Sequence, residues 1–98
     1  MTYLYVIENT RTGLVKIGYS RDPEQRCRTL QTGSADPLRV VHTARVNDDR
    51  ARLLERRLHM EINHHREQGE WFNLSAGKAQ GLVDYTVIRW HDDILLDI

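Results

Sequence analysis

The hydrophobic pattern of the first twenty residues predicts a pair of β-strands. Residues 3–8 are a run rich in aromatic and β-branched side chains, typical of a strand that is buried on both faces. Residues 14–20 alternate apolar with polar or small side chains, as a half-buried strand does. The turn cluster at 9–13 has the length of a hairpin loop, so the two strands are expected to pair antiparallel.

A helix is predicted after this hairpin. Asp22 is a typical capping residue and Pro23 suits the first helical position. Pro23, Cys27 and Leu30 form the stripe that faces inward, and Arg26 lies beside that stripe, with its head over the edge of the sheet. A Gly-Ser-Ala-Asp-Pro segment ends the helix.

Residues 38–46 predict a third strand whose side chains alternate strictly between two faces. One face is expected to hold Val40, His42, Ala44 and Val46, and Val41 belongs to the other.

The next helix is predicted to begin at the cap 47–49 and to run to about residue 66. Glu55 and His59 are one turn apart beside its core stripe, so they are expected to border the core rather than point fully into solvent. The stripe itself consists of Ala51, Leu54, Leu58 and Ile62.

The remaining pattern predicts an extended piece at 70–74 and a last helix capped by Ser75. The elements follow the order ββαβα, then a short strand and a helix. This order predicts an α+β fold in which helices flank a small, mainly antiparallel, three-stranded sheet, as one domain over residues 1–98. The apolar face of the last helix is expected to hold Ala79, Val83, Thr86, Val87, Trp90 and Ile94.

The composition is that of a globular protein, and its charge is unevenly distributed along the chain. The chain has 98 residues, of which 40% are hydrophobic and 29% charged, and it has one cysteine. No apolar run approaches the roughly 20 residues of a membrane span, so no membrane partner is expected. A single cysteine makes an intracellular, cytoplasmic setting the default. Residues 1–78 carry 13 basic and 10 acidic side chains, a net of +3, and residues 79–98 carry 1 and 4, a net of −3.

Three residue types in this pattern suit phosphodiester hydrolysis. Arg26 offers a permanent positive charge in a planar fork that matches phosphate oxygens. Glu55 can hold Mg²⁺ while the ion keeps most of its waters. Tyr5 could act as a base if its pKa, normally about 10, were lowered. Each of the three residues also has a purely structural explanation. Arg26 would be a solvated helix residue, Glu55 a member of a surface ion-pair network, and Tyr5 a core residue.

The spacing of these residues resembles the GIY-YIG nuclease superfamily. Tyr3-Leu4-Tyr5 occupies the place of its first motif and Lys16-Ile17-Gly18 the place of its second. Arg26 follows Gly18 by eight residues, and Glu55 matches the metal-binding glutamate of the next helix. The phage-type branch is the closer match, through Val15–Ser20, Asp22-Pro23, Leu54–His59 and Gly69–Phe72.

The resemblance, which covers about residues 3–75, implies an endonuclease that cuts DNA with Mg²⁺ or Mn²⁺. Tyr5, with Tyr19 or Lys16, would help to activate water, and Arg26 would neutralise the phosphate. Glu55 would be catalytic as the metal ligand, and His59 would relay a proton or position a water. Arg26, Arg52 and Arg56 would bind the nucleic acid. We also expect an intracellular protein of bacterial or phage origin that is a monomer or a weak homodimer.

The chain departs from that family pattern at three positions. Tyr3 replaces the first glycine, Lys16 replaces the second tyrosine, and Leu30 replaces a polar residue four positions after Arg26. These departures leave open a nucleic-acid-binding or regulatory module that has lost catalysis. An adaptor that pairs through the apolar last helix is a third alternative. A zinc site on His59, His64 and His65 is disfavoured, because their spacing does not share one helix face and a structural site needs four ligands.

Overall fold

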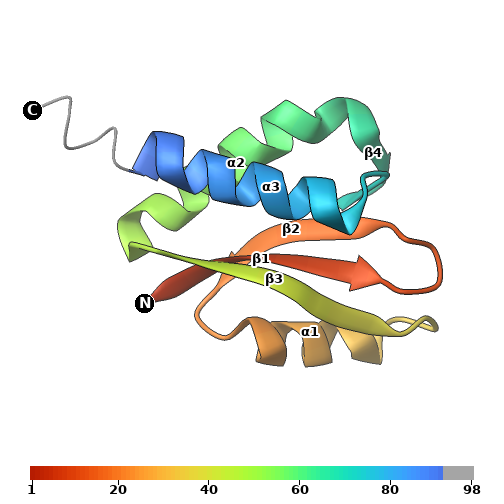
Figure 1. Ribbon diagram of the computed structural model, residues 1–98. Helices are drawn as coiled ribbons and strands as arrows, with labels where there is room; N and C mark the ends of the chain where they lie inside the picture. The colour runs from red at the N-terminus through yellow and green to blue at the C-terminus, as the bar shows by residue number, and fades with distance from the viewer. Residues whose placement is uncertain (92–98) are drawn as a thin grey trace, which may run out of the picture.

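A five-stranded antiparallel sheet lies between two helical layers, which confirms the α+β class (Figure 1). The computed structural model describes residues 1–91. Two short strands extend the predicted three-stranded sheet, so that the order across it is β3-β1-β2-β5-β4. The strands are β1 (Thr2–Asn9), β2 (Val15–Ser20), β3 (Leu38–Val46), β4 (Arg66–Gln68) and β5 (Trp71–Phe72).

The helices cover both faces of this sheet. In Figure 1, α1 (Pro23–Thr32) lies on one face, and α2 (Asp48–Ile62) and α3 (Ala76–Thr86) lie together on the other. A 3₁₀ turn, η1 (Asn63–His65), follows α2, and a wider π-helical turn, η2 (Val87–His91), follows α3. Among residues 1–91, none of the helices is both long and apolar enough to cross a bilayer.

The core is divided by the sheet into a larger and a smaller part. The larger part joins β1, β2 and β5 to α2 and α3, and the predicted α2 stripe is buried in it as expected. The smaller part lies under α1 and contains Tyr5, Ile7 and Cys27, with Leu30 packed against them. Because β1 is an interior strand between β3 and β2 and helices cover both sides of the sheet, both of its faces are buried, as its apolar run predicts.

A β-bulge corrects the predicted faces of β3. Val6 pairs with His42 but Ile7 pairs with Val40, so Val41 is an extra residue in the ladder. After the bulge the alternation is shifted by one residue. Val41 therefore packs on the larger core, whereas Val40 packs on the smaller core and does not share the face of His42.

The end of α2 also differs from the prediction. The helix ends at Ile62 instead of continuing to about residue 66, and Arg66 begins β4. The 3₁₀ turn at 63–65 tightens the chain, and it then reverses through Gly69, whose φ of +57° suits glycine. On the last helix, Ala79, Val83 and Thr86 are buried as predicted, and Ile94 lies outside the described residues.

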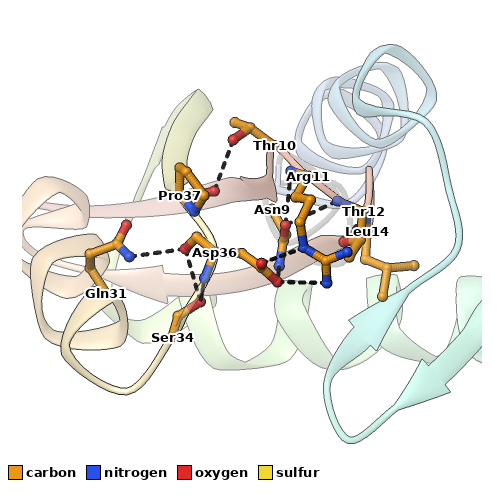
Figure 2. Close-up of polar contacts among 9 residues, drawn as sticks. All are labelled: Asn9, Thr10, Arg11, Thr12, Leu14, Gln31, Ser34, Asp36 and Pro37. Carbon is orange, nitrogen blue, oxygen red and sulfur yellow. Dashed lines mark hydrogen bonds and ion pairs between the residues drawn. The ribbon is translucent and has the colours of Figure 1, made fainter.

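A polar network fixes the hairpin loop to the segment that follows α1 (Figure 2). The Asp36 carboxylate accepts hydrogen bonds from the guanidinium of Arg11 and from Nδ2 of Asn9, the latter at 3.0 Å. Gln31 Nε2 donates to the Asp36 carbonyl at 2.9 Å, and the side chain of Gln31 thereby joins α1 to the same network. The bonds from Arg11 and then Asn9 hold the pKa of Asp36 below its usual value.

Candidate functional site

The open edge of β2 is where the predicted site residues meet. Strand β5 pairs only with Val15 and Lys16, so the edge from Ile17 onward has no neighbouring strand. Helix α2 passes this edge, and Nε2 of His59 lies 2.7 Å from the carbonyl oxygen of Ile17. Because a carbonyl only accepts, Nε2 is the donor in this contact. His59 therefore satisfies a strand carbonyl that no other strand reaches.

Tyr5 reaches this edge by lying across Gly18. The two residues are cross-strand partners in the β1–β2 hairpin. A Cβ built on Gly18 would lie 2.6 Å from Cζ of Tyr5, closer than real Cβ contacts. Only glycine lets the ring pack onto the backbone here. The missing side chain at Gly18 thus makes room for the phenol ring over β2.

Arg26 approaches Tyr5 from α1. The Asp22 side chain caps this helix by accepting a hydrogen bond from the Gln25 N–H at 3.0 Å. Pro23 and Cys27 face the core, and Arg26 flanks them, as predicted. Its guanidinium lies close enough to the Tyr5 hydroxyl to lower the pKa of that group. Burial nevertheless raises the pKa of Tyr5 above 10, and this effect exceeds the lowering by Arg26.

Lys16 lies on the same face of β2 as Gly18 and is almost fully buried, with 8% of its surface exposed. Its Nζ lies 2.7 Å from Oε2 of Glu70, which belongs to the turn between β4 and β5. This bond from Lys16 holds the pKa of Glu70 below its usual range. A buried ammonium needs a partner, and Glu70 supplies it.

Glu70 is a member of the site that the sequence does not reveal. It lies in the Gly69–Phe72 motif, but nothing in the sequence connects its carboxylate to Lys16. The pairing of Trp71 with Lys16 in the sheet makes this connection, because it brings the preceding turn over the buried ammonium.

Glu55 completes the group from α2 and is half-buried, as its position beside the core stripe predicted. Burial raises the pKa of its carboxyl, the nearby His59 lowers it, and the charge of Glu70 raises it again. The charges of Glu55 and Glu70 also act on Tyr5. We call these residues the edge cluster: Tyr5, Lys16, Arg26, Glu55, His59 and Glu70.

Tyr19 is the one predicted catalytic residue that lies apart from the edge cluster. Strand alternation places it on the opposite face of β2 from Lys16 and Gly18, and 40% of its surface is exposed. Leu30, the apolar replacement in the family pattern, packs against the smaller core beside Tyr5.

An open groove of about 530 Å³ begins at Glu55 and His59 and follows the outer side of α2. We call it the arginine groove, because Arg52, Arg56 and Arg66 line it. The first two were predicted to bind nucleic acid. The edge cluster therefore opens onto a surface where permanent positive charge is concentrated.

The donor set at Glu55 suits a hard ion that retains its own waters. Within residues 1–91, no group of three or more His, Cys, Asp or Glu side chains could hold a metal. The rings of His64 and His65 lie against each other at a tilt of 43°, with centroids 4.0 Å apart. A single carboxylate beside an imidazole fits Mg²⁺ or Mn²⁺, which bind through one or two carboxylates, and does not fit a four-ligand zinc centre.

Comparison with known families corrects the assignment made by resemblance. The family model that matches residues 2–90 is the T5orf172 domain, and it is not a GIY-YIG model. The likeness to GIY-YIG nucleases was therefore wrong as a family assignment. Neither a curated protein nor a solved structure matches the chain significantly. The match covers nearly the whole sequence, and the chain belongs to the T5orf172 domain family.

Proposed function

We propose that this protein is a metal-dependent DNA endonuclease that hydrolyses one phosphodiester bond per site with one divalent ion. The observation that carries the proposal is the edge cluster itself. A tyrosine hydroxyl, a guanidinium and a carboxylate come from three separate elements to one open strand edge. That edge continues into the arginine groove. Neutralising the charge of the reacting phosphate is the main requirement of this reaction.

The cationic side chains of the cluster would bind the scissile phosphate. Arg26 presents several N–H donors in a plane, near the Tyr5 hydroxyl. Lys16 adds a second positive charge, which is held at the strand by Glu70. Both side chains would stabilise the extra negative charge that forms as water attacks phosphorus.

Glu55 is the residue that would hold the divalent ion. When bound, Mg²⁺ or Mn²⁺ would supply charge neutralisation and a more acidic water. The carboxylate must be ionised to bind the ion, and its raised pKa makes this step sensitive to pH. With Glu55 as the single carboxylate ligand, the ion would keep most of its waters.

Proton transfer would involve His59 and Tyr5 in different ways. Nε2 of His59 is occupied by the Ile17 carbonyl, so Nδ1 would accept the proton of the attacking water. Tyr5 keeps its proton at neutral pH, because its pKa is raised. It would therefore orient the water or a phosphate oxygen by hydrogen bonding. The new bond joins water oxygen to phosphorus, and the leaving oxygen departs and takes a proton from solvent.

Cleavage of supercoiled plasmid tests this function. Wild-type protein should convert it to the nicked form with Mg²⁺ or Mn²⁺ and not with EDTA. Glu55→Gln should cut at least about 100-fold more slowly. Glu67→Gln, which removes an exposed carboxylate on β4, is the matched control and should cut like wild type. Equal rates for Glu55→Gln and wild type would refute the assignment of the metal ligand.

A second candidate is a DNA-binding module that does not cut. Two observations favour it. The Lys16 ammonium is already neutralised by Glu70, and the pKa of Tyr5 is raised rather than lowered. Plasmid binding without cleavage in either metal, over the pH range of folding, would support this module. Both candidates take DNA as the partner, and an intracellular location is proposed for both.

A further inference from the structure

A second groove lies next to the arginine groove, between α2 and the end of α3. It has a volume of about 570 Å³, which is in the range of small-molecule sites. Its lining includes Arg57, Tyr85 and Trp90, and it shares Arg56 and Met60 with the arginine groove. We call it the aromatic groove. Because the two grooves share these residues, an extended ligand could pass from Glu55 across α2 into the aromatic groove.

The aromatic groove carries positive charge on arginine side chains. The guanidinium of Arg57 stacks on Trp90 with Cζ 4.0 Å from the ring centroid, and that of Arg89 lies 5.1 Å from it. Within residues 1–91, no ion pair joins Arg56, Arg57 or Arg89 to an acidic side chain. Glu61 lines the groove without forming such a pair. Unpaired arginines beside an apolar surface favour an anionic ligand.

The apolar part of the groove is exposed to solvent. Tyr85 is 57% exposed and Met60 is 72% exposed. An exposed ring beside free guanidinium groups is the combination that binds unpaired nucleotides, whose bases stack while their phosphates are neutralised. A DNA duplex could use the arginines but not the ring, because its bases are already stacked inside the helix.

We propose that the aromatic groove holds single-stranded DNA that flanks the scissile phosphate. One base would stack on Tyr85, and Arg56 and Arg57 would bind the adjacent phosphates. The substrate class would then be DNA with an unpaired segment rather than a continuous duplex. This inference rests on the proposed function, because it takes the edge cluster as the place where the strand is cut.

Binding measured in EDTA tests the inference without any cleavage. Fluorescence anisotropy would compare a labelled oligothymidylate with a labelled duplex of the same length. Tyr85→Ala should weaken binding of the single strand about 10-fold and leave duplex binding within about 2-fold. Tyr85→Phe keeps the ring and is the matched control, which should bind the single strand like wild type. Arg57→Ala should also weaken binding, whereas Arg28→Ala, an exposed arginine on α1, should not.

The inference is overturned if Tyr85→Ala binds the single strand as tightly as wild type, or if both DNAs lose affinity equally. Light scattering tests the alternative that a second copy of the chain occupies the aromatic groove. A mass that doubles with concentration, and that Tyr85→Ala returns to the monomer, would show that a second copy of the chain fills the groove. The binding result is independent of the cleavage test. If Glu55→Gln did not slow cutting, the measured preference for single-stranded over duplex DNA would be unaffected.

Discussion

The phenol ring of Tyr5 packs directly on the backbone of Gly18, its cross-strand partner. The ring covers β2 at the point where the strand loses its neighbour β5. Its hydroxyl lies near the guanidinium of Arg26 of α1, which lowers its pKa against the larger rise caused by burial. The sheet, α1 and the open edge are thus joined through one close contact that a Cβ atom would prevent.

Replacing Gly18 with alanine should therefore impair both stability and cleavage. The added methyl overlaps the ring and forces Tyr5 away from Arg26, and overpacking of this kind costs about 1–3 kcal/mol. Chemical denaturation should show this loss, and plasmid nicking should fall with it. Gly81→Ala in α3 is the control. Its new methyl has open space, so stability should rise by up to about 1 kcal/mol. A Gly18→Ala variant as stable and as active as wild type would show that the ring position is unimportant.

Much of the fold followed from local patterns, because each pattern reflected a local cause. The apolar run of β1 and the stripe of α2 follow from burial at periods of 2 and 3.6 residues. The bulge at Val41 did not follow, because it depends on the pairing of β3 with β1 and leaves the alternation of the sequence unchanged. The short strand β4 was missed for a similar reason. Its three residues are all exposed and therefore show no hydrophobic pattern.

The candidate site was predictable where a residue's position followed from its own element. Glu55 and Arg26 flank helix stripes and lie where the helix period places them. Glu70 lies 54 positions from Lys16, and only the β2–β5 pairing brings the two together. Tyr19 follows Gly18 in the chain and therefore suggests a place in the site, but the period of the strand turns its side chain to the other face.

The raised pKa of Glu55 predicts a trade between stability and function. A carboxyl whose pKa is higher in the folded protein binds its proton more tightly there than in the unfolded chain. Folding is therefore disfavoured once the pH exceeds the unfolded value and the group must ionise. Glu55→Gln should be more stable than wild type at pH 8, and the difference should disappear near pH 4. Thermal unfolding at both pH values measures this, with Glu67→Gln as the control. A stability gain that did not change with pH would point to packing instead.

The network around Asp36 predicts the opposite dependence on pH. Arg11 and Asn9 lower the pKa of Asp36, so its contribution to stability is present above the unfolded value and is lost as the pH falls through the folded one. Asp36→Asn should therefore lower the unfolding temperature at pH 7. In acid, the unfolding temperature of wild type should fall toward that of the variant (Figure 2). Cleavage at saturating substrate should not change, because the network lies at the hairpin loop and contributes no residue to the edge cluster. A difference in unfolding temperature between the two proteins that is the same at all pH values would contradict this account.

The pair Lys16–Glu70 gives the sharpest test of the edge cluster, because its two members act on Glu55 in opposite directions. The charge of Lys16 lowers the pKa of Glu55, and the charge of Glu70 raises it. If cleavage requires ionised Glu55, Lys16→Met should shift the acidic limb of the pH–rate profile upward, and Glu70→Gln should shift it downward.

The same two variants form a double-mutant cycle for stability. Glu70 is mostly exposed, so the coupling energy at pH 7 should be about 1 kcal/mol or less and should fall with added salt. Because the pKa of Glu70 is lowered, the coupling is lost only when the pH falls through that lowered value. Shifts of the pH–rate profile in the same direction for both variants would mean that the rate does not report the ionisation of Glu55. Metal binding would then have to be assigned to another residue.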